Sequence, residues 1–390
     1  MIERTLEAQV HAARRAFSAV VVTGPRRAGK TSLLRHALPT APYYLFEDPD
    51  LIARFRADPQ GFLDGVRTPA ILDEVQQVPE LFAFARARID AAPKKKGQWF
   101  LTGSQESTLM QNVTESMAGR AAILNLLPLS SRESPRVTLL RGGFPEVILR
   151  PKTASLWFAS YLQTYLERDV RNITAVQDLS KFRRFLALLA ARHGAILNRS
   201  DIAAPLGVSV PTVSHWIDIL ETTGLIVVVP PYFENFGKRV VKSPKIYFVD
   251  AGLVCHLLGI QAEAELERSP FLGAVFEGHV ASEILKAQIG RGARKELYYY
   301  RDQSGLEVDF LAPGLHQGMP GVTMIEAKAG RTPTPDMAAP MLRLRDMWRG
   351  SPLNAAYVVH RLPRAGSVSR ALTPGAQAVG FADFVDLINW

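Results

Sequence analysis

The segment "GPRRAGKT", residues 24–31, has the residue types and the spacing needed to hold a triphosphate. Glycines allow backbone N–H groups to converge on phosphate oxygens, a following lysine reaches the outer phosphates, and a following hydroxyl binds Mg²⁺. An ordinary turn between a strand and a helix is the alternative. We predict that the whole loop and the next serine bind the nucleotide: Gly24, Pro25, Arg26, Arg27, Ala28, Gly29, Lys30, Thr31 and Ser32.

Two adjacent acids follow a short apolar stretch further along the chain. Asp73 and Glu74 come directly after Ile71 and Leu72. We predict that Asp73 binds Mg²⁺ with Thr31, directly or through water, and that Glu74 polarises the attacking water. Alone, such a pair is usually a solvated strand end. Downstream of a phosphate loop, it predicts a nucleotide hydrolase that uses ATP and Mg²⁺.

Two further residues are candidates for contact with the nucleotide. Ser104 ends the strand-like segment "GQWFLTGSQ", where its hydroxyl could sense the γ-phosphate, although a simple turn explains it equally well. Arg120 follows a glycine within an apolar stretch and could be an arginine finger or sensor, acting in its own subunit or on a neighbour. A structural ion pair is the alternative for Arg120. The predicted catalytic residues are Lys30, Asp73, Glu74 and Arg120.

A second set of acids lies near the C-terminus. Glu277 is on an expected amphipathic helix, Asp309 on a strand, and Glu326 and Lys328 on the next strand. Residues two apart on a strand share a face, so Glu326 and Lys328 could join one site with Asp309. Three carboxylates could hold a second Mg²⁺, with Lys328 steadying the attacking water, as in restriction-endonuclease-like folds. The alternative is a fold of this kind that holds DNA without cutting it.

Between these two sites, the chain has the pattern of a winged helix. Residues 198–231 read as helix, glycine turn, helix and strand, and "GKRVVKSPK" before a second strand reads as a basic wing that includes Lys245. Ser200 or Asp201 could cap the first helix. Contacts with another subunit or protein are the alternative to DNA contacts. The predicted DNA-binding residues are Ser209, Thr212, Ser214, Lys238, Arg239 and Lys242.

The expected elements place these residues in order. "AVVV" reads as a buried parallel strand before the phosphate loop, and "TSLLRHAL" as the helix after it. From about residue 150, apolar residues recur at three- and four-residue spacings, which predicts helices. Within them, Tyr165, Arg168 and Asp169 are expected to serve packing and ion pairs.

Composition bounds the function. Hydrophobic residues make up 47% and charged residues 21%, as in globular proteins, and 46 Lys and Arg against 37 Asp and Glu give a net charge of +9. This excess favours a polyanionic partner such as DNA about as much as a solvated basic surface. The single cysteine, Cys255, excludes a disulfide framework and a zinc-thiolate site. With no signal-peptide-like start and no apolar run of membrane length, we expect a cytoplasmic protein without membrane contact.

The order of motifs "GPRRAGKT", "LDEVQQVPEL", "LTGSQ", "AGR…LLPLS", "GGFPEV" and "YLERDV" resembles a family of bacterial and archaeal ATPases of the AAA superfamily. That family has a C-terminal domain of poorly defined function, whose E…VDF…EAK arrangement is matched by Glu277, residues 308–310 and residues 326–328. The resemblance implies an α/β fold: an AAA-type P-loop core with a parallel sheet (1–128), a helical lid (129–195), a winged helix-turn-helix (196–258) and an α/β restriction-endonuclease-like domain (265–390). It also implies a homo-oligomer, by analogy.

We therefore predict an ATP-binding and ATP-hydrolysing protein that acts on, or is regulated by, duplex or branched DNA. One alternative is a metal-dependent DNA nuclease gated by ATP. Another is a nucleotide switch that binds a protein partner and keeps the nuclease-like fold as a scaffold.

Overall fold

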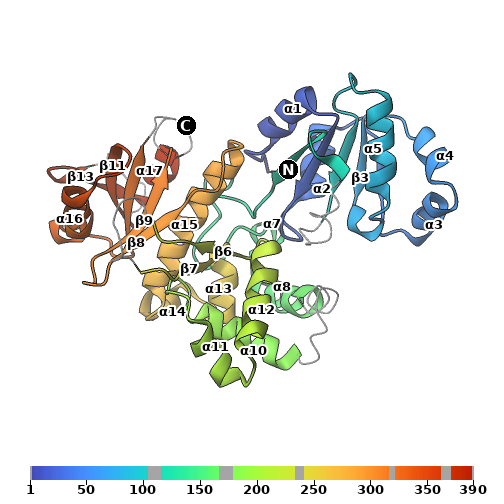
Figure 1. Cartoon of the computed structure of the whole chain (residues 1–390). Coiled ribbons are helices and arrows are strands. Elements are labelled where there is room, and N and C mark those ends of the chain that lie inside the picture. The colour runs from blue at the N-terminus through green and yellow to red at the C-terminus, as the bar shows by residue number, and fades with distance from the viewer. Residues whose placement is uncertain are drawn as a thin grey trace. The chain divides into compact units, whose positions relative to one another are not determined.

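The computed structural model describes residues 2–103, 116–166, 179–232, 241–315, 321–361 and 370–388 (Figure 1). The chain forms two compact units. The first unit contains residues 1–128 with 222–224 and 289–293, and the second contains 129–221, 225–288 and 294–390. The predicted residues outside the described part are Ser104, Arg168, Asp169, Lys238 and Arg239, together with the side chain of Tyr165.

The first unit is built on a five-stranded parallel sheet with the order β2-β3-β4-β1-β5. All five residues of β1, the predicted "AVVV" strand with its flanking Thr23, are buried. Continuous apolar strands of this kind are typical of parallel sheets covered on both faces. The strands are β1 (Ala19–Thr23), β2 (Tyr43–Leu45), β3 (Ala70–Asp73), β4 (Trp99–Thr102) and β5 (Ala121–Asn125).

Helices of the first unit begin at clear local signals. Asp48 accepts a hydrogen bond from the N–H of Asp50 at 3.0 Å, and Asp58 accepts one from Gly61 at 2.9 Å. Each aspartate precedes a proline at the first helical position, the combination expected at a helix N-terminus. The helices are α1 (Glu7–Ala16), α2 (Lys30–Ala37), α3 (Pro49–Ala57), α4 (Pro59–Asp64), the 3₁₀ turn Val75–Gln77 and α5 (Leu81–Ala91).

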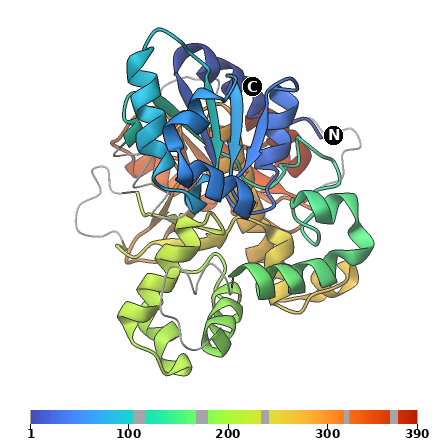
Figure 2. The same ribbon diagram turned by 90° about the vertical axis from the view of Figure 1, so that its right-hand side faces the viewer.

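In the second unit, a helical region (the described residues of 129–268) carries a small antiparallel pair, β6 (Ile226–Val229) and β7 (Lys245–Phe248). Its helices α10, α11 and α12 pack around Phe182, Phe185 and Trp216. Figure 2 shows the ribbon of this region in green and yellow. The helices are α7 (Pro145–Leu149), α8 (Ala154–Tyr161), α10 (Leu179–Ala190), α11 (Arg199–Leu206), α12 (Val210–Thr222), α13 (Ala251–Leu257) and α14 (Glu263–Arg268), with the 3₁₀ turn Pro151–Thr153 and the π-helical turn Leu162–Leu166.

The turn between α11 and α12 is at Gly207, as predicted, and its positive φ of 60° ends α11. The predicted cap of α11 was wrong. Asn198, rather than Ser200 or Asp201, caps the helix by accepting from the N–H groups of both residues at 3.1 and 3.4 Å. A capping side chain must precede the first helical turn, and α11 begins before Ser200.

The "GGFPEV" motif serves a tight connection within the helical region. The N–H of Gly143 donates to Asp250 at 2.7 Å, and the other carboxylate oxygen of Asp250 accepts from Leu253 at 2.9 Å. A Cβ on Gly143 would lie 2.0 Å from the carbonyl oxygen of Leu129. This contact leaves room for glycine alone.

The C-terminal domain (the described residues of 272–388) is a six-stranded mixed sheet with the order β12-β13-β11-β10-β9-β8. Helices α15 and α17 cover one face around Phe276, Phe310 and Phe384, and α16 covers the other around Met341. The elements are α15 (Leu272–Gly290), β8 (Tyr298–Arg301), β9 (Glu307–Pro313), β10 (Val322–Lys328), the 3₁₀ turn Pro335–Ala338, α16 (Ala339–Met347), β11 (Leu353–His360), β12 (Arg370–Thr373), β13 (Ala376–Gly380) and α17 (Phe381–Ile388).

Candidate nucleotide-binding site and C-terminal acidic cluster

The predicted phosphate loop joins the carboxyl end of β1 to the start of α2. Gly24 and Gly29 have φ values of +136° and +99°, which L side chains rarely adopt. A Cβ on Gly24 would lie 2.1 Å from the carbonyl oxygen of Leu126. The two glycines of the motif are therefore required by the backbone path of the loop itself.

Lys30 is held within this loop. Its side chain is buried, and its ammonium donates to the carbonyl oxygens of Gly24 at 3.0 Å and Pro25 at 3.1 Å. The loop is also held from outside, because the Arg4 guanidinium donates to the carbonyl oxygens of Ala28 at 2.8 Å and Leu127 at 2.7 Å. Sequence reasoning missed Arg4, since it lies 20 residues before the motif and has no pattern of its own.

Thr31 and Asp73, the predicted Mg²⁺ ligands, are brought together. The Thr31 hydroxyl donates to Asp73 Oδ2 at 2.8 Å, and the Tyr43 hydroxyl donates to the same oxygen at 2.6 Å. The Thr102 hydroxyl donates to the other oxygen, Oδ1. Burial, followed by the hydrogen bond to Asp73, raises the pKa of Tyr43 above its ordinary value, so its hydroxyl stays a donor. A hydroxyl and a carboxylate at a helix start suit Mg²⁺, which prefers oxygen ligands.

Glu74 follows β3 in an unusual backbone conformation. Its φ is +57°, and Arg27 in the phosphate loop has a φ of +59°. Within the described ranges, these are the non-glycine residues with positive φ, and such residues concentrate at functional sites. The Glu74 N–H donates to Thr102 Oγ1 at 3.4 Å, and its carboxylate accepts from Gln76.

Arg120 is not brought to the phosphate loop. It lies just before β5, where its carbonyl oxygen accepts from Ala19 at the start of β1. Because β1 and β5 are parallel, Arg120 lies at the amino ends of the strands, and the loop lies at the carboxyl ends. Its guanidinium makes two contacts with Asp90, at 2.5 and 3.0 Å, which lower the pKa of Asp90. The ion-pair alternative describes this arrangement, and a role towards a neighbouring subunit stays a prediction.

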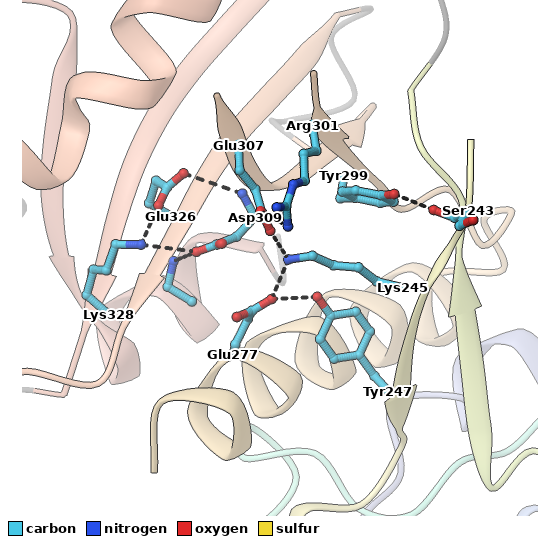
Figure 3. Close-up of polar contacts among 11 residues, drawn as sticks. Ser243, Lys245, Tyr247, Glu277, Tyr299, Arg301, Glu307, Asp309, Glu326 and Lys328 are labelled. Atoms are coloured by element: carbon cyan, nitrogen blue, oxygen red, sulfur yellow. Dashed lines mark hydrogen bonds and ion pairs between the residues drawn. The ribbon is translucent and has the colours of Figure 1, made fainter. Parts of the chain in front are cut away.

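In the C-terminal domain, Asp309, Glu326 and Lys328 meet as predicted from strand periodicity (Figure 3). The Lys328 ammonium is 2.5 Å from Glu326 Oε2 and 3.4 Å from Asp309 Oδ2. The N–H of Ala327 also donates to Asp309 Oδ2, at 2.9 Å. Neighbouring antiparallel strands β9 and β10 place the three side chains on one face.

Glu277 has other partners. Its Oε1 accepts from Lys245 at 3.0 Å and from the Tyr247 hydroxyl at 2.6 Å, and both of these residues are on β7 of the helical region. Lys245 also contacts Glu307 at 2.6 Å. Lys245 was predicted to be part of a basic wing, whereas its side chain is 4% exposed and contacts these acids. Glu307 lies two residues before Asp309, so strand periodicity was a usable signal for it. Tyr247 had none.

The four acids Glu277, Glu307, Asp309 and Glu326, termed the acidic cluster, are electrostatically linked. Burial, followed by the charge of Asp309, raises the pKa of Glu277 to about 7 and that of Glu326 to about 8. Burial alone would lower the pKa of Lys328, but Asp309 and Glu326 raise it. In the part of the chain that the structure describes, no group of three or more His, Cys, Asp or Glu residues is placed to hold a metal ion.

The predicted DNA-binding residues that are described lie at the start of α12 and after β6. The Ser209 hydroxyl accepts from the N–H of Thr212 at 3.2 Å and contacts its hydroxyl at 2.8 Å, so it begins the helix. Ser214 is half-buried and Lys242 is exposed. Helix α12 contains no Lys or Arg, and it carries Asp218 and Glu221.

Among the described helices, none combines the length and the apolar character needed to cross a bilayer.

The parallel sheet, the phosphate loop and the Thr31–Asp73 contact define a P-loop domain of AAA type. Comparison with family models matches an AAA domain at residues 16–134, a domain of unknown function (DUF8612) at 132–264 and another (DUF4143) at 272–371. The chain therefore belongs to the AAA superfamily, as a member with a C-terminal DUF4143 domain. The predicted family is confirmed, and so is the predicted α/β fold class of a parallel-sheet AAA-type core followed by a helical region and a mixed-sheet domain.

Relatives are known at two levels of similarity. The uncharacterized proteins Rv2008c of Mycobacterium tuberculosis and Mb2031c of Mycobacterium bovis are each 34% identical over 297 residues. The match covers 74% of this chain, and the chain spans about 66% of the length of either relative.

Solved structures are more distant. The Walker-type ATPase PABY2304 of Pyrococcus abyssi is 17% identical, with a TM-score of 0.44, and the match covers 66% of this chain and 96% of that one. The RuvB Holliday junction branch migration motor of Thermotoga maritima is 15% identical, with a TM-score of 0.31 and coverage of 58% and 89%. Similarity at this level transfers no function.

Proposed function

We propose that this protein binds ATP with Mg²⁺ at the phosphate loop and hydrolyses it, and that DNA held by the second unit regulates or is moved by this cycle. The observation that carries the ATPase proposal is the contact of Thr31 with Asp73 at 2.8 Å, beside a buried Lys30. A hydroxyl, a carboxylate and an ammonium are thereby placed together at the start of α2.

Each residue has a distinct part in the proposed reaction. On nucleotide binding, the Lys30 ammonium would exchange the carbonyl oxygens of Gly24 and Pro25 for phosphate oxygens. Thr31 and Asp73 would hold Mg²⁺, which neutralises charge on the phosphates. Glu74, next to Asp73 at the same strand end, would accept a proton from the attacking water.

DNA contact is supported by charge and by the helical region. The net charge is +9, and α11 and α12 are joined by a glycine turn as in helix-turn-helix units. Because α12 lacks Lys and Arg, base-edge readout by this helix has little support. Exposed Arg183 and Arg184 on α10 instead favour contact with the phosphate backbone, which is independent of sequence and weakened by salt.

The test is ATP turnover, measured alone and with single-stranded, duplex and branched DNA at two salt concentrations. We expect Mg²⁺-dependent turnover that changes severalfold with DNA and is abolished in Lys30→Ala. Lys95→Ala is a matched control, since Lys95 is an exposed lysine of the same unit. Turnover in the wild type that ignores every DNA would reject the DNA part and favour a switch that binds a protein. Absence of turnover under all conditions would reject hydrolysis.

A DNA nuclease gated by ATP is the second candidate, favoured by the meeting of Asp309, Glu326 and Lys328. It predicts Mg²⁺- or Mn²⁺-dependent cleavage of DNA that disappears in Lys328→Ala while ATP turnover persists. Cleavage that survives in Lys328→Ala would contradict it.

A further inference from the structure

Gln76 lies in the 3₁₀ turn Val75–Gln77, which directly follows the predicted base Glu74. The side chains of Val75 and Val78 are fully buried and belong to the hydrophobic core of the first unit. The N–H of Val78 donates to the carbonyl oxygen of Val75 at 3.0 Å and closes the turn. The backbone of Gln76 is therefore anchored in the core on both sides, at a fixed position next to Glu74.

The side-chain amide of Gln76 uses one of its two ends. Its Nε2 donates to Glu74 Oε2. Because an ionised carboxylate accepts hydrogen bonds and donates none, the nitrogen of the amide must face Glu74, and the oxygen must face elsewhere. This oxygen, Gln76 Oε1, is buried, and no described residue donates to it. Buried polar atoms in folded proteins almost always have a partner, so Oε1 indicates a donor that a bound molecule supplies.

One water molecule fits between the two side chains. In a planar amide the oxygen lies about 2.3 Å from the nitrogen, which places Gln76 Oε1 roughly 3.5–5 Å from the Glu74 oxygen that accepts from Nε2. A water that donates both of its hydrogens spans two acceptors about 4.5 Å apart. Its lone pairs then face away from both acceptors. Since β1 and β3 are both parallel to β4, Glu74 and the phosphate loop follow strands that end at the same edge of the sheet.

We propose that Gln76 is the second acceptor for the attacking water, with Glu74 as the first, and that its Nε2 holds the Glu74 carboxylate in place. This inference rests on the proposed hydrolysis of ATP. In that step the water oxygen bonds to the γ-phosphorus, the bond from this phosphorus to the β–γ bridging oxygen breaks, and the electron pair leaves on ADP. Glu74 takes one proton of the water, and the hydrogen held by Gln76 remains on the phosphate.

The test compares Gln76→Met with Gln77→Met in the full chain. Methionine has about the volume of glutamine and lacks both ends of the amide. Gln77 is a half-buried glutamine of the same turn, and it contacts Arg56 through its backbone oxygen, which the change keeps. ATP turnover is measured against ATP concentration with Mg²⁺. We expect kcat to fall about a hundredfold in Gln76→Met while KM stays within about threefold, and we expect Gln77→Met to keep both values within about threefold.

Binding of ADP with aluminium fluoride and Mg²⁺ gives a readout other than turnover, because this complex resembles the phosphoryl group under attack. We expect aluminium fluoride to tighten ADP binding at least about tenfold in the wild type and in Gln77→Met, and to give no such gain in Gln76→Met. All three proteins should bind a non-hydrolysable ATP analogue equally well. A purely structural role for Gln76 predicts that both complexes weaken together.

Turnover in folded Gln76→Met within about threefold of the wild type would overturn the inference and leave the proposed ATPase function standing. Equal weakening of the ATP analogue and the aluminium fluoride complex would also overturn it. If calorimetry shows that Gln76→Met does not fold, Gln76→Asn decides: it keeps the amide but is one methylene too short, and we expect turnover at least about tenfold slower. An unchanged rate in Gln76→Asn counts against the inference. A wild type without turnover would reject the proposed function itself, and this inference with it.

Discussion

A methyl group added at the first glycine of the phosphate loop tests whether the backbone of the loop is as tight as the structure has it. In Gly24→Ala, the new Cβ would lie 2.1 Å from the carbonyl oxygen of Leu126, and it must move to at least 3.0 Å. The residue would also keep a φ of +136°, a strain of about 1–3 kcal/mol for a side chain other than glycine. The loop must therefore move by an appreciable fraction of an ångström, or the strand end beside it must give way.

The expected consequence is loss of nucleotide binding more than loss of fold. A displacement of about 1 Å in a positioning element can lower turnover about a hundredfold. We expect Gly24→Ala to lose ATP turnover by about that factor and to bind a fluorescent ATP analogue at least tenfold more weakly. The strain predicts a fall in the unfolding temperature of the first unit, measured by calorimetry.

Gly119→Ala is the matched control. Gly119 is in the same unit and has a φ of +71°, but a Cβ there would meet no atom of the described residues within 4 Å. It isolates the backbone strain, about 1–2 kcal/mol, from the steric clash. If Gly24→Ala and Gly119→Ala both bind nucleotide within threefold of the wild type, the close approach of Gly24 to Leu126 does not matter for nucleotide binding, and the prediction is wrong.

Three other predictions concern single side chains. Asp73→Asn should lower ATP turnover at least a hundredfold in a Mg²⁺ titration; turnover within tenfold of the wild type would remove Asp73 from the metal site. Arg120→Ala should leave the nucleotide affinity of the isolated subunit unchanged by fluorescence titration, because Arg120 lies at the opposite edge of the sheet from the loop; a tenfold weaker affinity would contradict this placement. Burial lowers the pKa of His193 to about 3, so below pH 6.5 the unfolded chain binds a proton that the folded chain excludes. This histidine therefore leaves the free energy of unfolding unchanged above pH 6.5 and lowers it by about 1.4 kcal/mol per pH unit between pH 6.5 and 3. The free energy of unfolding is measured with urea at pH 5 and pH 7.5 in the wild type, in His193→Asn, which keeps an acceptor for the N–H of Phe248, and in His215→Asn, a control at an exposed histidine. The difference between the two pH values should be smaller in His193→Asn than in the other two proteins. An equal difference in all three would contradict the role of His193.

The phosphate loop was predictable because its chemistry is local. Gly24, Gly29 and Lys30 lie within one short loop between β1 and α2, and the backbone conformation of this loop requires glycine at residues 24 and 29. Asp73 was predictable for a second reason: the carboxyl ends of parallel strands meet at one edge, so an acid at the end of β3 reaches the end of β1. This prediction needed the fold family alone and did not depend on the exact order of the strands.

The partners of Asp73 were not predictable to the same degree. Tyr43 and Thr102 reach Asp73 because β2 and β4 flank β3 in the sheet. This order differs from the order in the chain, since β4 lies between β3 and β1. Pattern alone gave no reason to single out Tyr43. At the end of β4, the contact of Thr102 with Asp73 was also not predicted. Ser104, the residue that the sequence singled out there, lies outside the described residues, and its role stays a prediction.

Lys245 shows where sequence reasoning fails for physical reasons. Basic residues between two strands predicted a basic wing, and nothing in the local sequence distinguishes Lys245 from Lys242. Its burial follows from Glu277 and Glu307, which lie 32 and more residues away in the chain. Long-range compensation of charge decides which lysine is exposed, and it requires the packing of β7 against α15 and β9.

The most direct measurement is nucleotide uptake and turnover by the purified protein with Mg²⁺, compared in the wild type, Lys30→Ala and Glu74→Gln. We predict that the wild type binds and hydrolyses ATP, that Lys30→Ala does neither, and that Glu74→Gln binds ATP and retains it uncleaved. A wild-type protein that takes up no nucleotide with Mg²⁺ present, or a Lys30→Ala protein that hydrolyses ATP at the wild-type rate, would contradict this prediction.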